Sequence, residues 1–356
     1  MPQNLPSADL HHILDHTRDL WDDLRGARIF ITGGTGFFGT WLLESFLFAN
    51  QQLDLKAHVS VLTRRPDAFQ HALPHLGLDS AITLHQGDVR NFEFPKGEYS
   101  HVIHAATETN PDFKDIDPLE KFTSNIEGTH RVLDFAVKSR ADKLLFTSSG
   151  AVYGRQPPEM THIPETYTGA PETTDINNAY GQSKRTSEFL CAAYAKENGF
   201  HALIARCFAF VGPRLSLNSN YAIGNFIRDA LHGNPIQIGG DGTPYRSYLY
   251  AADLAIWLWT IFLRGQSCRP YNVGSEIELS IAQLAKTVSD GISPGLSIQI
   301  VKQPAPNQPA ERYVPMTLRA KEELGLQEII KLPDAIQRTA QWYAYNMGEE
   351  NAKGHD

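Results

Sequence analysis

The chain has 356 residues, of which 42% are hydrophobic and 20% are charged, and its formal net charge at pH 7 is −8. This length and apolar content suffice for one large domain or two closely joined ones, so a mini-protein and a globally disordered chain are excluded. No basic block interrupts the acidic balance, which argues against nucleic-acid binding driven by net charge.

The first predicted element is an amphipathic helix within an N-terminal extension, residues 1–25. This segment is polar overall and lacks the apolar core of a signal peptide. His12 and His16 lie one helical turn apart, but no third ligand is near, so we predict no metal site. The apolar side chains expected to pack onto the main body are Leu10, Ile13, Leu14, Leu20, Trp21 and Leu24.

From Arg28 onward, strand patterns alternate with helix patterns, which is typical of a parallel sheet covered by helices. The predicted strands are Arg28–Thr32, His58–Thr63, Ile82–His85, His101–His104, Lys143–Thr147 and His201–Arg206. The predicted crossover helices are the stretch after Gly39, Leu119–Ser139 and Tyr180–Asn198. We therefore predict an α/β fold, a doubly wound parallel sheet of the Rossmann type over residues 26–206, completed by parts of 240–275.

After Arg206 the alternation weakens, and separate helices are predicted over 225–232, 252–263 and 280–290. We assign residues 207–346 to a smaller C-terminal lobe. The longest apolar run, Leu254 to Leu263, is about half the length that a membrane-spanning helix needs. Three scattered cysteines, at 191, 207 and 268, suit neither a disulfide framework nor a thiolate zinc site. A cytoplasmic protein is therefore expected.

A glycine-rich turn follows the first predicted strand and precedes an apolar helix. Gly33 permits a tight turn, Gly36 lets a phosphate approach the backbone, and Gly39 lets the helix pack close to the strand. The spacing is G-x-x-G-x-x-G, not the G-x-G-x-x-G of simple dehydrogenases. The order of strand, glycines and helix predicts a site for the pyrophosphate of a dinucleotide, to which Thr35, Phe37 and Phe38 also belong.

The end of the second predicted strand bears on which dinucleotide fits. An NAD site usually has an acidic residue there for the ribose 2′-hydroxyl, whereas this chain has Thr63, Arg64 and Arg65. Two guanidinium groups can clamp a 2′-phosphate, so NADP is favoured over NAD. The alternative is that both arginines simply face solvent.

A candidate catalytic group combines a helix and a strand end. Tyr180 and Lys184 lie one turn apart on one helix face. A phenol with the ordinary pKa of about 10 is a poor base at pH 7, and a nearby ammonium lowers that pKa by stabilising the phenolate. Ser149 follows an upstream strand in a loop of small residues, at the sheet edge where ligands bind. We expect Ser149 to hydrogen-bond the reacting oxygen and Tyr180 to exchange its proton.

These features resemble the extended short-chain dehydrogenase/reductase superfamily, and within it the NAD(P)-dependent sugar-nucleotide epimerase/dehydratase group. The resemblance runs from about Arg28 to Leu326. Its carriers are TGGTGFFG (32–39), GDV (87–89), HAA (104–106), NIEGT (125–129), SSGAVYG (148–154), YGQSK (180–184), VGPR (211–214), GDGTPYRSYLYAADLA (240–255) and YNVGS (271–275).

The resemblance implies roles for further residues. It implies that Asp88, Val89, Ala105, Ala106 and Asn125 line or support the cofactor site, along with Tyr180 and Lys184. It implies a nucleotide-diphosphate sugar as substrate, with Arg246 gripping the diphosphate, as guanidinium groups do well. Further substrate contacts are expected from Thr107, Ser149, Asn225 and Arg312, and a homodimer is expected through the helices at 119–139 and 180–198.

The chain departs from the group's pattern at two places. Dehydratases of the group usually carry an Asp-Glu pair, and sugar-acid decarboxylases a Glu, immediately after the position of Ser149, whereas this chain has Gly150 and Ala151. The acid and base for proton abstraction at C5 are therefore missing from their expected places. Ala209 stands where many relatives have Asn, so a sugar-phosphate hydrogen bond is lost or replaced.

A triad without the extra carboxylates favours hydride transfer at C4 of the sugar, by a 4-ketoreductase using NADPH or by a 4-epimerase that retains NAD. The arginine pair tilts the choice toward the reductase. One alternative is a 4,6-dehydratase whose acid and base come from elsewhere, for example Glu108 or Asp112. Another is an NDP-uronate decarboxylase, since residues 214–227 and 240–250 look most like that activity. A non-catalytic nucleotide-binding module is the remote alternative, because the triad is complete.

Overall fold

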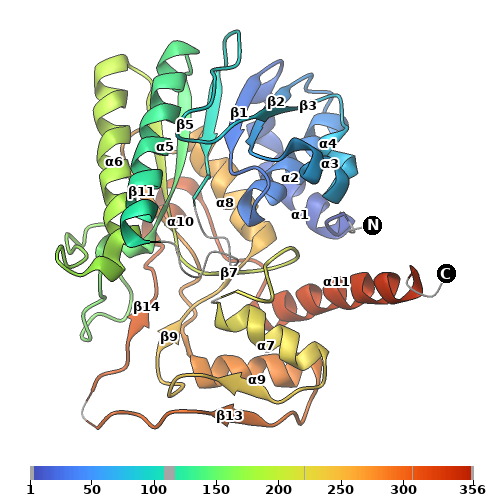
Figure 1. Ribbon diagram of the computed structural model, residues 1–356, viewed down its shortest axis with the longest axis vertical. Coiled ribbons are helices and arrows are strands. Elements are labelled where there is room, and N and C mark those ends of the chain that lie inside the picture. Colours follow the sequence, from blue (N-terminus) through green and yellow to red (C-terminus); the bar gives the residue numbers. More distant parts are fainter. Residues whose placement is uncertain (1–3, 108–116, 220, 307, 354–356) are drawn as a thin grey trace.

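The computed structural model describes residues 4–107, 117–219, 221–306 and 308–353 (Figure 1). Within these ranges no helix is both long enough and apolar enough to cross a membrane.

A parallel sheet forms the centre of the molecule. In the described part of the chain it has seven strands in the order β11-β6-β5-β4-β1-β2-β3. The strands are β1 (Arg28–Thr32), β2 (His58–Thr63), β3 (Ile82–Gln86), β4 (His101–His104), β5 (Lys143–Ser149), β6 (His201–Cys207) and β11 (Pro270–Val273). β1 pairs with both β2 and β4, so the strand order reverses there. The carboxyl ends of strands at such a reversal form the crevice in which ligands bind.

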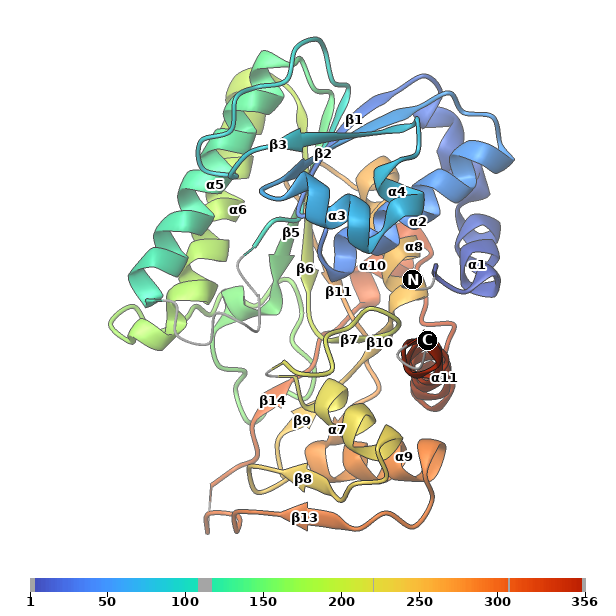
Figure 2. The same ribbon diagram turned by 45° about the vertical axis from the view of Figure 1, so that its right-hand side comes forward.

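Alternate side chains of each strand enter two different cores. Ile29 and Ile31 of β1 pack into the larger core, with α2 (Phe37–Gln52) and α8 (Ala251–Arg264). Phe30 points to the opposite face and joins the core formed with α5 (Pro118–Lys138) and α6 (Ala179–Asn198). Figures 1 and 2 both show α5 and α6 side by side on one face of the sheet. The predicted doubly wound α/β fold is therefore confirmed.

The N-terminal segment is a helix followed by a 3₁₀ turn rather than a single helix. α1 (Ser7–Thr17) ends where η1 (Arg18–Leu24) begins, and both pack near α8. Of the predicted apolar contacts, Leu10 is half-buried and the other five are buried. His12 Nε2 lies 2.9 Å from Asp253 Oδ1 of α8, and His16 is exposed. Among the described residues, no group of three or more His, Cys, Asp or Glu is arranged to hold a metal.

The C-terminal lobe lies below the carboxyl edge of the sheet (Figure 2). Its elements are α7 (Ala222–Leu231), β8 (Ile236–Ile238), α9 (Ile281–Ile292) and β13 (Ile298–Ile300). Short strands connect it to the sheet domain: β7 (Phe210–Val211), β9 (Tyr245–Arg246), β10 (Leu249–Tyr250), β12 (Leu279–Ser280) and β14 (Arg312–Tyr313). The remaining helices are α3 (Pro66–Ala72), α4 (Pro74–Gly77), η2 (Gly150–Tyr153), η3 (Ile176–Asn178), α10 (Leu318–Leu324) and α11 (Leu332–Lys353).

Candidate active site

The turn between β1 and α2 is shaped by its own packing. A Cβ at Gly33, whose φ is +74°, would lie 2.5 Å from backbone atoms of Ala105 and Ala106. A Cβ at Gly39 would lie 2.2 Å from the carbonyl oxygen of Gly33. The helix begins at Phe37, two residues earlier than Gly39, so Gly39 lies in its first turn against this loop. Packing alone therefore requires glycine at 33 and 39.

Gly36 differs from these two glycines. A Cβ there would meet nothing closer than the carbonyl oxygen of Gly33, at 3.5 Å, and both Thr35 and Gly36 are exposed. The first N–H groups of a helix, here those of Phe37 and Phe38, have no acceptor within the helix, and the helix dipole favours an anion beside them. Open space in front of free donors fits the pyrophosphate of a dinucleotide. When bound, a nicotinamide dinucleotide would supply the hydride acceptor of a redox reaction.

Charged side chains gather at the same sheet edge. Arg64 and Arg65 are exposed and directly follow β2, the neighbour of β1. Asp88 follows β3, and its carboxylate accepts hydrogen bonds of 2.8 and 3.2 Å from the guanidinium of Arg90. Arg90 lowers the pKa of Asp88, and Arg64 lowers it further. Asp88 therefore reaches the predicted cofactor edge as a carboxylate already paired with Arg90.

Asn125 of α5 connects three parts of the predicted site. Its Nδ2 donates to Ser183 Oγ of α6 at 2.9 Å, and its Oδ1 accepts from Thr107 Oγ1 at 3.3 Å. The neighbouring Val89 packs against α5, because a Cβ on Gly128 would lie 2.9 Å from Val89 Cγ1. Thr107, Asn125 and α6 are therefore held together behind the sheet edge.

The structure brings the predicted triad together. Ser149 is the last residue of β5, and Tyr180 lies in the first turn of α6. Lys184 Nζ donates to the carbonyl oxygen of Thr147 at 2.9 Å and lies 5.9 Å from the centroid of the Tyr180 ring. β5 runs two residues beyond the predicted end at Thr147, so that Ser149 is fixed by the sheet rather than carried on a loop.

The pKa values of the triad differ from the sequence-based expectation. Burial raises the pKa of Tyr180, and the neighbouring phenol of Tyr313 raises it further, whereas a hydrogen bond with Ser149 lowers it. Burial lowers the pKa of Lys184 to about 8. Burial has the largest effect on the pKa of Tyr180, and the expected lowering by the ammonium of Lys184 is not among the main causes of its shift. The raised pKa favours the protonated phenol, which is the form that donates a proton when a ketone is reduced, whereas taking a proton from a hydroxyl needs the phenolate.

Tyr313 is a member of this cluster that the sequence analysis missed. Its Oη lies 3.4 Å from Ser149 Oγ, and a Cβ built on Gly150 would lie 2.7 Å from the same Oη. Tyr313 is more than 130 positions after Tyr180 in the chain and belongs to no motif, so only the register of β14 brings it here. The resemblance implied a substrate contact for the adjacent Arg312 instead.

Strand alternation separates Arg312 from the cluster. β14 pairs with β9 so that Tyr313 lies opposite Arg246 and Arg312 lies opposite Tyr245. Arg246 Cζ is 6.0 Å from the ring centroid of Tyr313, and Arg312 Cζ is 4.2 Å from that of Tyr245. Because neighbouring residues of a strand point to opposite faces, Arg246 is on the face of Tyr313 and the triad, whereas Arg312 is on the other face, paired with Glu278.

Asn225, another predicted substrate contact, and Ala209, where a sugar-phosphate hydrogen bond is expected to be lost, form hydrogen bonds with other parts of the described chain. Asn225 of α7 donates to the carbonyl oxygen of Ser219 at 3.0 Å and accepts from Arg228 at 3.3 Å. Ala209 is half-buried, and its carbonyl oxygen accepts from Leu249 at 3.1 Å. Glu108 and Asp112, the suggested substitute acid and base, lie outside the described residues.

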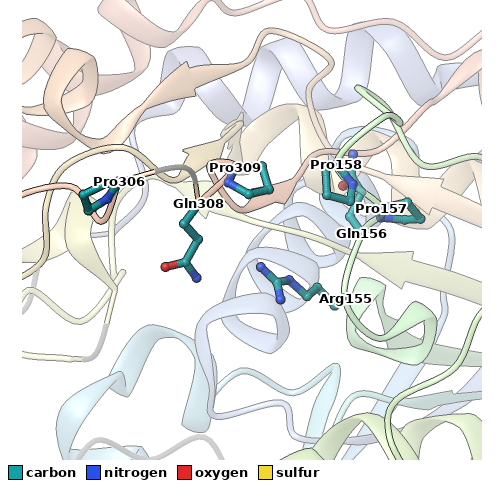
Figure 3. Close-up of a pocket in the computed structure, with 7 residues that line it drawn as sticks. All are labelled: Arg155, Gln156, Pro157, Pro158, Pro306, Gln308 and Pro309. Carbon is teal, nitrogen blue, oxygen red and sulfur yellow. The ribbon is translucent and has the colours of Figure 1, made fainter.

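A pocket of about 390 Å³ is lined by none of the predicted site residues (Figure 3). Its walls come from two proline-containing segments, and the labelled residues are Arg155, Gln156, Pro157, Pro158, Pro306, Gln308 and Pro309. Gln156 Oε1 accepts a hydrogen bond of 3.0 Å from the backbone N–H of Val314, the residue that follows β14. The pocket wall therefore helps to fix the strand that carries Tyr313.

Comparison with known proteins agrees with the fold. Residues 29–274 match the NAD dependent epimerase/dehydratase family. Among curated proteins, UDP-glucuronic acid decarboxylase 5 of Arabidopsis thaliana is 29% identical over 321 residues, which is 90% of each chain. UDP-glucuronic acid decarboxylase 1 of Xenopus tropicalis is 28% identical, over 89% of this chain and 72% of its own.

Solved structures show the same fold. DesIV, a dTDP-glucose 4,6-dehydratase from Streptomyces venezuelae with NAD and TYD bound, has a TM-score of 0.76 at 24% identity, covering 90% of this chain and 98% of its own. A UDP-N-acetylglucosamine 4-epimerase from Methanobrevibacter ruminantium has a TM-score of 0.76 at 20% identity, with coverages of 90% and 99%. With the family match spanning most of the sheet domain and its connections, the chain belongs to the NAD-dependent epimerase/dehydratase family of extended short-chain dehydrogenases/reductases.

Proposed function

We propose that the protein is an NAD(P)-dependent enzyme that decarboxylates a nucleoside-diphosphate uronate through transient oxidation at C4. The observation that carries this proposal is the identity of the curated relatives, which at 27–29% are UDP-glucuronic acid decarboxylases. The sequence analysis placed a 4-ketoreductase or 4-epimerase first and a decarboxylase among its alternatives. The comparisons favour that alternative.

The chemistry of the site is compatible with decarboxylation. Once C4 is a ketone, the carboxylate on C5 is β to a carbonyl, and the electrons of the breaking C5–C6 bond pass into an enolate. A 4,6-dehydratase instead needs a base for the C5 proton and an acid for the departing oxygen on C6. Gly150 and Ala151 offer neither. Loss of carbon dioxide needs no base for the C5 proton, whereas loss of water does, so the missing carboxylates count more heavily against a dehydratase.

The triad residues take complementary parts in this reaction. Tyr180 exchanges a proton with O4, and Ser149 hydrogen-bonds the same oxygen. Lys184, anchored to Thr147, keeps a positive charge beside the phenol. Arg246, on the face of the triad, binds the diphosphate of the substrate, for which a planar guanidinium is well suited.

The cofactor proposed is NADP, on the strength of Arg64 and Arg65 at the end of β2 and the absence of an acidic residue there. We expect the double substitution Arg64→Ser with Arg65→Ser to weaken NADP binding about tenfold or more and to leave NAD binding within about twofold. Titration of both cofactors against wild type and variant measures this. Equal losses for the two cofactors would remove the arginines from 2′-phosphate recognition.

A homodimer through α5 and α6 is also proposed. These helices lie side by side, and their exposed apolar side chains include Leu119, 69% exposed, and Phe189, 71% exposed (Figures 1 and 2). Exposed apolar side chains on a helix pair are typical of an interface. Light scattering should give twice the chain mass for wild type and the single mass for Phe189→Asp.

The reaction itself is tested by incubating the purified protein with UDP-glucuronate and NAD⁺ or NADP⁺, followed by mass spectrometry and NMR of the nucleotide products. Release of carbon dioxide with formation of a UDP-pentose supports the proposal. Conversion to UDP-galacturonate without loss of mass supports a 4-epimerase, and stoichiometric oxidation of NADPH by a 4-keto sugar nucleotide supports a reductase. Either of these without carbon dioxide release would overturn the decarboxylase assignment.

A further inference from the structure

We propose that Tyr313 is a second proton donor of this site, which protonates C5 of the sugar after carbon dioxide has left. This inference rests on the proposed decarboxylase function and adds a residue and a step to it.

Tyr313 lies where such a donor has to be. Its Oη is 3.4 Å from Ser149 Oγ, and Ser149 is also hydrogen-bonded to Tyr180, so the three hydroxyl groups form one cluster. If Ser149 and Tyr180 bind O4, the third hydroxyl is within reach of a neighbouring ring carbon. Arg246, directly opposite Tyr313 in the strand register, places the diphosphate contact on the same face.

Tyr313 also fills the space that a carboxylate at position 150 would need. A Cβ on Gly150 would lie 2.7 Å from Tyr313 Oη and 2.7 Å from two ring carbons of Phe208. Gly150 therefore has no room for a side chain unless both Tyr313 and Phe208 move. The site thus has no acidic side chain directly after β5, and the phenol of Tyr313 in β14 lies there instead.

The backbone that carries the Tyr313 phenol is held in place by hydrogen bonds. The segment around β14 is tied on both sides, because Tyr245 N–H donates to the carbonyl oxygen of Glu311 at 2.7 Å and Val314 N–H donates to Gln156 Oε1 at 3.0 Å. Ile163 N–H also donates to the carbonyl oxygen of Val314 at 2.9 Å. A donor with a fixed backbone gives the stereochemical control that protonation of one enolate face needs.

The charge state of Tyr313 suits an acid. Burial raises the pKa of this phenol, while hydrogen bonding with Ser149 and the charge of Arg246 act in the opposite direction. The raised value keeps the group protonated at neutral pH, and the two opposing contacts stabilise the phenolate left after it has given up its proton. The phenolate then regains a proton from solvent before the next turnover.

The step balances as follows. In the 4-keto uronate the C5–C6 bond breaks, carbon dioxide leaves, and the electron pair forms the C4–C5 enolate. The Tyr313 O–H bond then breaks, its proton bonds to C5, and the C4 ketone is restored for return of the hydride from the reduced nicotinamide dinucleotide. Overall, one uronate and one proton give one pentose nucleotide and one carbon dioxide.

The test compares wild type, Tyr313→Phe and Tyr245→Phe. Tyr245 is the control because it pairs with Arg312, so its phenol lies on the opposite face of the strands from Tyr313. Each is incubated with UDP-glucuronate and cofactor in D₂O, and C5 of the product is examined by NMR. Wild type and Tyr245→Phe should place one deuterium at a single C5 position. Tyr313→Phe should still release carbon dioxide but should form UDP-pentose at least tenfold more slowly, release a 4-keto pentose nucleotide and scramble deuterium between both C5 positions.

Melting temperatures of the proteins without substrate should agree within about 2 °C, since removing one hydroxyl leaves the ring packing intact. Gly150→Ala, which displaces the phenol, should give the same scrambled label.

Tyr313→Phe with unchanged product rate and a single labelled position would overturn the inference alone. A parallel loss of carbon dioxide release and product would assign Tyr313 a merely structural role. Absence of carbon dioxide release by wild type would instead overturn the proposed function, and this inference with it.

Discussion

At the scale of single residues, the proposed reaction makes turnover depend on the phenol of Tyr180. Tyr180→Phe should lower turnover by about three orders of magnitude or more, because the proton path to O4 is lost while the cofactor cradle is untouched. Cofactor binding, measured by fluorescence titration, should stay within about twofold. Tyr194→Phe on the same helix is the control, since that hydroxyl contacts only Asp134 and His130 among the described residues. Equal turnover in Tyr180→Phe and wild type would remove Tyr180 from the mechanism.

The buried ammonium of Lys184 predicts a pH dependence of stability. Burial lowers its pKa from 10.5 to about 8, so between these pH values the unfolded chain holds a proton that the folded protein has lost. Stability therefore rises with pH through this window, and below about pH 8 the full cost of burying the charge is present. Relative to Lys184→Met, wild type should gain roughly 2 kcal/mol between pH 7 and pH 10.

Urea unfolding of both proteins at each pH measures this gain, since contributions of other groups cancel in the difference. A difference in unfolding free energy that stays constant from pH 7 to pH 10 would contradict the assignment of a depressed pKa to Lys184.

At the scale of elements, the β1–α2 turn contains one glycine that we expect folding to need, Gly33, and one that we expect cofactor binding to need, Gly36. Gly33→Ala places a Cβ 2.5 Å from backbone at a positive φ, and should destabilise the protein by about 3 kcal/mol or more. Gly36→Ala meets only one contact at 3.5 Å, so its melting temperature should stay within about 2 °C while cofactor affinity falls at least tenfold. Gly239→Ala, with nothing within 4 Å, should change neither.

Thermal melting and cofactor titration of the three variants test these expectations together. If Gly36→Ala bound the dinucleotide as tightly as wild type, the pyrophosphate would have to bind elsewhere than in front of the first turn of α2.

At the scale of the whole molecule, one buried carboxylate joins the two ends of the chain. Asp9 of α1 is 1% exposed, and it accepts hydrogen bonds from Tyr250 at 2.6 Å and from Arg338 of α11 at 2.8 Å. Asp9→Ala leaves both partners without their acceptor and should cost about 3 kcal/mol of unfolding free energy, measured by denaturation. Asp15→Ala, at an exposed position of the same helix, should cost less than about 0.5 kcal/mol. Similar costs at the two sites would show that the ends are not coupled through Asp9.

Much of the sheet and the triad could be predicted from the sequence, because both depend on short-range patterns. Apolar runs of strand length set the starts of β1 to β6, and helical spacing put Tyr180 and Lys184 on one face. The short strands of the lobe escaped prediction because two- or three-residue strands carry no periodicity. α11 escaped because its described part carries many polar residues and packs through only a few apolar side chains.

The sequence by itself determined the family and predicted the dinucleotide cradle and the triad, since each rests on residues close together in the chain. Only the tertiary structure decided that burial keeps Tyr180 neutral, that Arg246 and Arg312 lie on opposite strand faces, and that Tyr313 occupies the space above Gly150. Those outcomes depend on desolvation and on the pairing of β9 with β14, which join residues more than 60 positions apart and leave no local trace in the sequence.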